Sequence, residues 1–281
     1  MPRQIAIGLS LALLAALVAT SFSKAKAAEK VMTIPTRPEV TVKAVISEDA
    51  GSVAPIIILL MGGGGVLDLD GWDGKGNPHD NFLIRSRHLF AKEGVNFVAP
   101  DAPSDVASPY ADRPLVGFRT TPEYAADMKA IVDFMRSRGN SGAVFLAGAS
   151  RGSIGAAGAA ARLFPDIIDG IVLSSTVTRT GRRGPSVHSA KLSAIKVPVL
   201  FTHHEDDPCN STPSSAIPSV AKKLTAASSV KQLYFKGGGS YQGRDCSPLT
   251  AHGFHGIEAK VVQGIVAWIK SVSAKRSRPP K

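Results

Sequence analysis

Short runs of β-branched and aliphatic residues alternate with longer segments of helical periodicity along this chain. Parallel strands need crossover connections, usually helices, so this alternation predicts an α/β fold with a mostly parallel, doubly wound sheet and helices on both faces. The predicted strands are residues 55–61, 96–99, 143–147, 170–174, 197–202 and 230–235. The predicted helices are residues 81–93, 121–138, 151–164 and 256–272.

The connections between these elements predict a single domain. Loops rich in glycine and proline occur at residues 67–78, 101–120 and 176–196, and none is long enough to fold by itself. We therefore expect no large lid domain. One domain over residues 28–272 has room for a substantial core. Residues 273–281 are expected to form a basic, disordered tail.

The first 27 residues have the layout of a secretory signal peptide. Arg3 lies in a short basic start, an apolar run extends from Ile5 to Thr20, and Ala25 and Ala27 form a small-residue cleavage site. The alternative is an uncleaved membrane anchor, because the apolar run is close to the length that spans a bilayer. We expect cleavage after Ala27 and a periplasmic or secreted protein.

The formal net charge is +11 at pH 7. Apart from the tail, the basic residues are scattered, and they form no nucleic-acid-binding motif. We therefore expect no specific nucleic-acid partner, and only weak electrostatic binding to anionic surfaces.

A serine between two glycines, Gly148-Ala149-Ser150-Arg151-Gly152, lies at the junction of a predicted strand and helix. A serine hydroxyl becomes a useful nucleophile when a tight turn exposes it beside a base, and flanking small residues let that turn close. The alternative is a glycine-rich turn with an incidental serine. The strand before it and the Gly/Ala-rich helix after it favour a nucleophile.

Acidic and histidine residues follow at two later places in the chain. Residues 203–207 (His-His-Glu-Asp-Asp) end a predicted strand, and residues 251–255 (Ala-His-Gly-Phe-His) precede the last helix. An acid at a strand end can orient an imidazole, which then takes the serine proton. Adjacent histidines on a strand point to opposite faces, so a metal site at residues 203–207 is disfavoured. We expect no metal and no other cofactor.

Four glycines, residues 62–65, follow the predicted strand at 55–61. Glycines let main-chain N–H groups approach a substrate closely, so this loop and the N–H of Arg151 are candidates to stabilise an oxyanion. A phosphate-binding loop is the alternative. It is disfavoured because no Gly-Lys-Ser/Thr follows and the spacing is not Gly-x-Gly-x-x-Gly.

These motifs together resemble the α/β-hydrolase superfamily, more closely a group of bacterial, often exported, hydrolases. The resemblance is carried by residues 62–65, 81–87, 101–105, 148–152, 203–207 and 252–254 and by both cysteines. It implies an α/β-hydrolase fold over residues 28–272 and a serine hydrolase that cleaves carboxylic ester or related acyl bonds. The substrate would be a small-molecule or polymeric ester, cleaved through an acyl-enzyme intermediate.

The resemblance also implies roles for individual residues. Ser150 is the nucleophile and His252 the base, with His255 as the alternative base. Asp207 is the acid, since in the superfamily the acid usually lies four residues after a histidine at the strand end. Asp206 is the alternative acid.

The oxyanion hole of many lipases and esterases follows a histidine, and Met61 stands at that position here. We take Gly63 and Arg151 as the residues whose N–H groups bind the oxyanion. A different class of function is a non-catalytic exported binding protein that keeps the fold. The combination of nucleophile, acid, base and glycine loop favours the enzyme.

Cys209 and Cys246 are the only cysteines, two residues after the expected acid and six before the expected base. If the catalytic residues meet, these two loops converge, and disulfides persist in exported proteins. We therefore expect a Cys209–Cys246 disulfide. The alternative is a pair of free, buried thiols.

Overall fold

The computed structural model describes residues 29–276, apart from residues 73–74, 107–113, 164 and 182–183. The predicted signal peptide and residues 277–281 of the predicted tail lie outside the described residues. Within the described part of the chain, no helix has both the length and the apolar character needed to cross a membrane.

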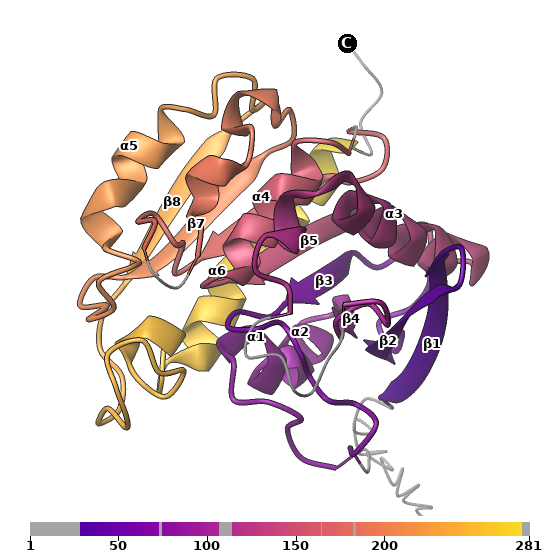
Figure 1. Ribbon diagram of the computed structural model, residues 1–281, viewed down its shortest axis with the longest axis horizontal. Helices are drawn as coiled ribbons and strands as arrows, with labels where there is room; N and C mark the ends of the chain where they lie inside the picture. The colour runs from indigo at the N-terminus through magenta and orange to yellow at the C-terminus, as the bar shows by residue number, and fades with distance from the viewer. Residues whose placement is uncertain (1–28, 73–74, 107–113, 164, 182–183, 277–281) are drawn as a thin grey trace, which may run out of the picture.

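Eight strands form one sheet in the order β1-β2-β4-β3-β5-β6-β7-β8 (Figure 1). The strands from β3 to β8 pair in parallel wherever they are neighbours. Every residue of β3, β4, β5 and β6 is buried, as expected for strands covered on both faces. The predicted α/β fold with a mostly parallel sheet is confirmed. Its parallel strands are β3 (Ile56–Leu60), β4 (Asn96–Pro100), β5 (Val144–Ala149), β6 (Gly170–Ser174), β7 (Val199–His204) and β8 (Val230–Phe235).

Two further strands, β1 (Lys30–Arg37) and β2 (Val40–Ser47), extend one edge of the sheet and were not predicted. They form an antiparallel hairpin, and β2 pairs antiparallel with β4. In β1 only Ile34 is buried, so its sequence lacks the continuous apolar run that marks the central strands.

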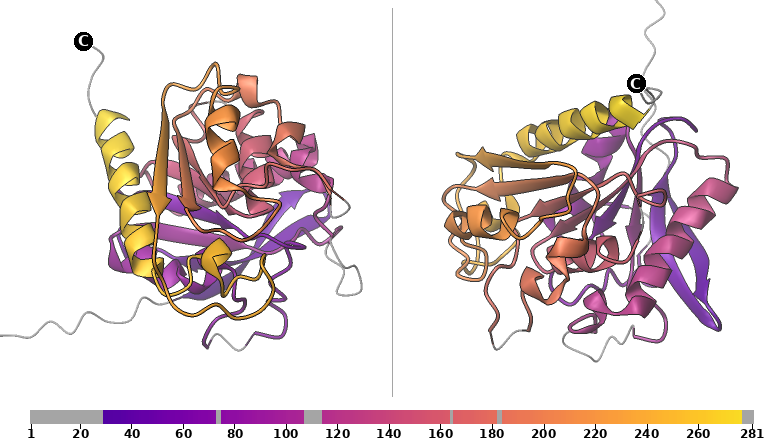
Figure 2. Two further views of the ribbon diagram at one scale, coloured as in Figure 1. Left: turned by 90° about the vertical axis from the view of Figure 1, so that its left-hand side faces the viewer. Right: turned by 90° about the horizontal axis from the view of Figure 1, so that it is seen from above.

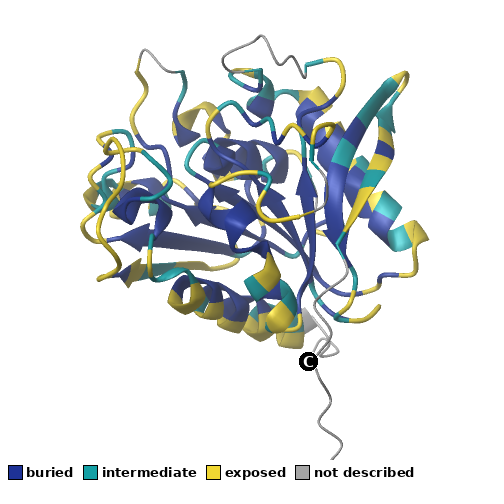
Figure 3. Ribbon diagram, turned by 90° about the horizontal axis from the view of Figure 1, so that it is seen from below, coloured by how far each residue is buried: buried dark blue, intermediate teal, exposed yellow. Residues whose placement is uncertain are grey.

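Helices cover both faces of the sheet (Figure 2). One face carries α3 (Pro122–Ser137), α4 (Gly152–Ala160) and α5 (Ile217–Ala221). The other carries α1 (Phe82–Arg85), α2 (Arg87–Lys92) and α6 (Glu258–Arg276). Side chains of the central strands alternate between the two apolar cores, and these strands are buried between the helical layers (Figure 3).

Three predicted helix boundaries were wrong. The predicted helix at 81–93 is two short helices that meet at Ser86. Helix α4 ends at Ala160 rather than near residue 164, consistent with Pro165, which disfavours helical geometry in the residue before it. Helix α6 extends to Arg276, so residues 273–276 of the predicted tail are helical. The Ala-Lys-Arg sequence at 274–276 favours that continuation.

Candidate active site

Ser150 occupies the tight turn between β5 and α4, in the left-handed backbone region with φ 53°. That conformation is strained for a residue other than glycine. The turn depends on close backbone approach on both sides. A Cβ on Gly148 would lie 2.1 Å from the carbonyl oxygen of Gly152, and one on Gly152 would lie 2.0 Å from that of Leu60. Glycine is therefore required two residues before and after the serine.

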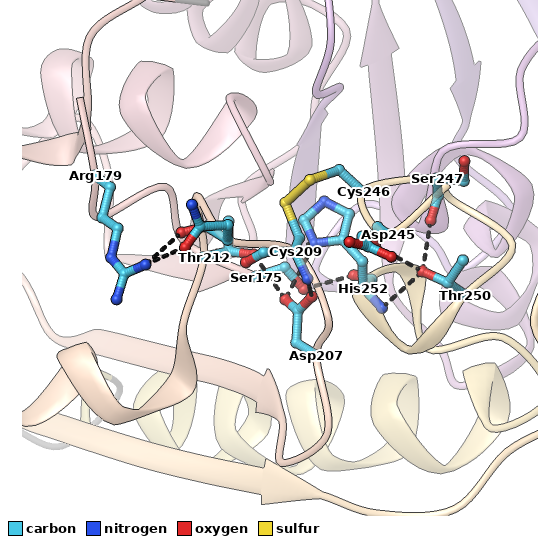
Figure 4. The surroundings of a disulfide bond; sticks show 11 residues. Ser175, Arg179, Asp207, Cys209, Thr212, Asp245, Cys246, Ser247, Thr250 and His252 are labelled. Atoms are coloured by element: carbon cyan, nitrogen blue, oxygen red, sulfur yellow. Dashed lines mark hydrogen bonds and ion pairs between the residues drawn. A yellow bond between two sulfur atoms is a disulfide. The ribbon is translucent and has the colours of Figure 1, made fainter. Parts of the chain in front are cut away.

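Asp207 and His252 meet in a hydrogen-bonded pair (Figure 4), and His252 lines a cavity that Ser150 also lines. His252 Nδ1 lies 3.1 Å from Asp207 Oδ2, and the two side chains are 5 % and 0 % exposed. A neutral imidazole that donates Nδ1–H to the carboxylate has Nε2 left as the basic nitrogen. The pair thus has the geometry of an acid that orients a general base.

The Asp207 carboxylate has a hydrogen bond at each oxygen in addition to His252. Cys209 donates its main-chain N–H to Oδ1 at 2.9 Å, and Thr212 donates its hydroxyl to Oδ2 at 2.8 Å. Thr212 Oγ1 also lies 3.2 Å from His252 Nδ1. These bonds fix the carboxylate plane and compensate for burying its charge.

The loop that carries His252 is held at three points. Ser175 donates its hydroxyl to the carbonyl of His252 at 2.7 Å, and Arg85 donates to the next carbonyl at 2.6 Å. Phe254 has φ 56° and is fully buried, with its ring centroid 4.9 Å from that of Phe82. The Phe254 side chain therefore packs into the core while His252 faces Asp207.

The alternative acid and base lie elsewhere. Asp206 is exposed, and its main-chain N–H donates to His204 Nδ1 at 3.0 Å. His255 Nδ1 lies 3.8 Å from a carboxylate oxygen of Glu258 on α6. The structure brings together Asp207 and His252, and neither alternative.

Both histidines at the end of β7 are engaged with the main chain. His203 Nε2 accepts the N–H of Thr176 at 3.0 Å, and His204 Nε2 bonds to the carbonyl of Gly237 at 2.7 Å. Burial lowers the pKa of His203 to about 3, against the opposing charge of Asp207. Among the described residues, no three His, Cys, Asp or Glu side chains gather as metal ligands.

The glycine loop after β3 rests on a buried arginine. Arg119 donates to the carbonyls of Met61 at 3.2 Å and Gly63 at 3.3 Å, and the carbonyl of Gly62 accepts the N–H of Gly65 at 3.2 Å. Burial lowers the pKa of Arg119 to about 10, which still leaves it protonated at neutral pH. Because a trans peptide points its C=O and N–H in opposite directions, fixing these carbonyls also fixes the N–H groups of the loop.

A cavity of about 120 Å³ connects these parts. It brings the Ser150 turn, His252 and the glycine loop to one space. Its lining includes Ser150, His252, Gly62, Gly63, His79 and Asn81. A larger open depression of about 450 Å³ lies between His188 and Lys223, and it contains none of the predicted site residues.

No protein-family model and no curated protein matches this sequence. Solved structures do match the fold. Est1E from Butyrivibrio proteoclasticus is 15 % identical with a TM-score of 0.57, over 87 % of this chain and 99 % of that one. The Pyrococcus furiosus esterase Pf2001 is 13 % identical with a TM-score of 0.57, over 86 % and 91 %. This chain has the α/β-hydrolase fold. The Pyrococcus horikoshii acylaminoacyl peptidase also matches, at 12 % identity and a TM-score of 0.60, over 89 % of this chain and 42 % of its own.

In this α/β-hydrolase fold, Cys209 and Cys246 form a disulfide between positions 37 residues apart (Figure 4). Cys209 lies in the loop of Asp207, to which it donates its main-chain N–H, and Cys246 lines the cavity together with His252. The bond therefore ties the loop after β7 to the loop that leads to His252.

Sequence reasoning missed the residues that support the candidate site. Thr212, Ser175 and Arg119 belong to no local motif, and each meets its partner only through the fold. Arg85 and Asn81 lie in the 81–87 segment that the superfamily resemblance identified, but that resemblance assigned them no role. The one local feature that could have pointed to such a supporting residue is the position of Thr212, five residues after Asp207.

Proposed function

We propose that this protein is an exported serine hydrolase that cleaves carboxylic esters or related acyl bonds. The observation that carries the proposal is the hydrogen-bonded Asp207–His252 pair at a cavity that Ser150 also lines. The α/β-hydrolase fold supports it, and one of the similar structures is named as an esterase. Fold alone does not define an activity, so the proposal rests on the side chains.

In the first half of the reaction, Ser150 Oγ attacks the substrate's carbonyl carbon and His252 Nε2 takes its proton. Asp207 holds the imidazole in the tautomer that leaves Nε2 basic, and its charge stabilises the imidazolium that forms. Thr212 supports this step by donating its hydroxyl to Asp207 Oδ2, the oxygen that His252 Nδ1 meets.

The oxyanion is stabilised by the N–H groups of Gly63 and Arg151. Gly63 lines the cavity, and Arg151 follows the nucleophile as the N-cap of α4. Collapse of the tetrahedral intermediate expels the alcohol, which receives the proton from His252. Water, activated by the same histidine, then attacks the acyl-enzyme and releases the acid.

The substrate is a small-molecule ester or an ester group on a polymer. A cavity of about 120 Å³ is well below the roughly 300 to 1,000 Å³ of drug-sized sites. A small group on one side of the scissile bond therefore fits this cavity. The rest of the substrate extends beyond it.

Export is supported by the N-terminal sequence and by the disulfide, a bond that persists in oxidising compartments. Glu29 supports processing after Ala27, because its carboxylate binds the buried Arg87 at 2.7 Å. Cleavage there keeps this ion pair in the mature protein. Intact-mass analysis of exported protein tests the site, and a retained apolar segment would indicate a membrane anchor instead.

Turnover on a panel of p-nitrophenyl esters, lactones and amides tests the activity. We expect ester hydrolysis by the parent and a loss of about three to six orders of magnitude in folded Ser150→Ala. Turnover like that of the parent in Ser150→Ala would remove this residue from the mechanism. A parent protein inactive on the whole panel would favour the alternative, a binding protein that keeps the fold.

A further inference from the structure

The side-chain amide of Asn81 is held in place with its nitrogen unused. Asn81 is 9 % exposed and immediately precedes α1. Its Oδ1 accepts the main-chain N–H of Leu83 at 3.2 Å, and the main-chain N–H of Asn81 donates to His79 Nδ1 at 2.9 Å. Because Leu83 supplies a donor, the atom it meets must be the amide oxygen, which fixes the assignment of Nδ2. None of the described residues accepts a hydrogen bond from Nδ2.

Gly62 shows how close this nitrogen is to the nucleophile. A Cβ added to Gly62 would lie 3.3 Å from Asn81 Nδ2, 3.0 Å from Ser150 Cβ and 2.8 Å from the carbonyl oxygen of Ala149. The missing side chain at Gly62 therefore leaves one small space that both Nδ2 and Ser150 border. Asn81, Ser150 and Gly63 all line the same cavity.

We propose that Asn81 Nδ2 donates a hydrogen bond to the oxyanion, as a side-chain member of the oxyanion hole. This inference rests on the proposed serine hydrolase function. When Ser150 Oγ bonds to the carbonyl carbon, the carbonyl π electrons move to oxygen and the serine proton moves to His252. Asn81 transfers no atom. The hydrogen bond from Nδ2–H strengthens as negative charge develops on the oxygen, so it stabilises the transition state more than bound substrate.

The amide nitrogen is not needed for the local fold. Capping α1 uses only Oδ1, and a serine hydroxyl can supply the same acceptor. Asn81 lines the cavity, so a ligand oxygen bound there can serve as the acceptor for Nδ2. Capping and catalysis can therefore be separated by substitution.

Asn81→Ser retains a helix cap and removes the amide donor. We expect kcat on an ester substrate to fall by about 10² to 10³, with KM and the melting temperature close to those of the parent. Affinity for a trifluoromethyl ketone, which forms a tetrahedral oxyanion on serine, should fall in parallel with kcat/KM. Thr121→Ala removes the cap of α3, which accepts the N–H of Tyr124 at 3.2 Å. This control should lower the melting temperature and leave kcat unchanged.

The outcomes separate this inference from the proposed function. If the parent hydrolyses esters, Ser150→Ala does not, and Asn81→Ser keeps kcat within about threefold, the oxyanion role is overturned while the function stands. An effect confined to KM would also overturn it, because the amide would then contribute to binding of the substrate and not to stabilisation of the transition state. A parent without turnover or ketone binding would overturn both proposals.

Discussion

Removing the Cys209–Cys246 bond is expected to lower stability strongly and turnover only slightly. The bond joins positions 37 residues apart, and a loop of that length corresponds to about 3.8 kcal/mol in the chain-entropy treatment. In a domain of this size each kcal/mol shifts the melting temperature by about 2 to 4 °C, so we expect a drop of about 8 to 15 °C. Turnover below the transition should fall less than tenfold, because Thr212 and the N–H of Cys209 still hold Asp207.

Calorimetry of the parent with and without reductant measures this change. The double variant Cys209→Ala/Cys246→Ser is the matched control, since its transition should equal that of the reduced parent and should not respond to reductant. A shift below about 2 °C would refute the stability argument. Alkylation of both cysteines in native, unreduced exported protein would refute the bond itself.

Substitutions at four other positions have distinct expected results. Asp207→Asn should lower kcat by up to about 10⁴, because the amide favours the wrong imidazole tautomer. Asp206→Asn changes an exposed side chain and should keep activity near that of the parent, and the reverse ranking would reassign the acid. Arg119→Met should lower kcat by about tenfold or more, since it frees two carbonyls of the glycine loop; unchanged steady-state kinetics would exclude that positioning role. In the folded protein burial lowers the pKa of His203 to about 3, so the imidazole is neutral, whereas in the unfolded chain it is protonated below about pH 6.5. The free energy of unfolding therefore falls as pH decreases, by about 2 kcal/mol at pH 5. Urea unfolding at pH 7.5 and pH 5 should show a smaller difference in His203→Gln, and an equal difference would contradict this linkage.

The parts of the fold that could be predicted have strong local signals. The central strands are apolar runs bounded by glycine turns, and the turn at Ser150 needs glycine at fixed positions on both sides. The β1–β2 hairpin escaped prediction because its edge strand is largely exposed, with only Ile34 buried, and so has no continuous apolar run. The break at Ser86 likewise lies within a pattern of apolar residues that fits one longer helix.

Support for the site could not be predicted because it comes from contacts between distant parts of the chain. Thr212 meets His252 across 40 residues, and Arg85 meets the carbonyl of Gly253 across 168. Arg119 lies in a short 3-10 helix, Phe118–Thr120, and only the assembled fold brings it to the carbonyls of the glycine loop. Such contacts depend on the three-dimensional convergence of loops, which periodicity and spacing do not report.

Covalent labelling by a fluorophosphonate tests the central claim most directly, because it requires an activated serine and does not require knowledge of the substrate. Intact mass followed by peptide mapping should show one adduct, on Ser150, that forms slowly or not at all in His252→Ala and is lost in Ser150→Ala. An unlabelled folded parent, or an adduct on a different serine, would contradict the account.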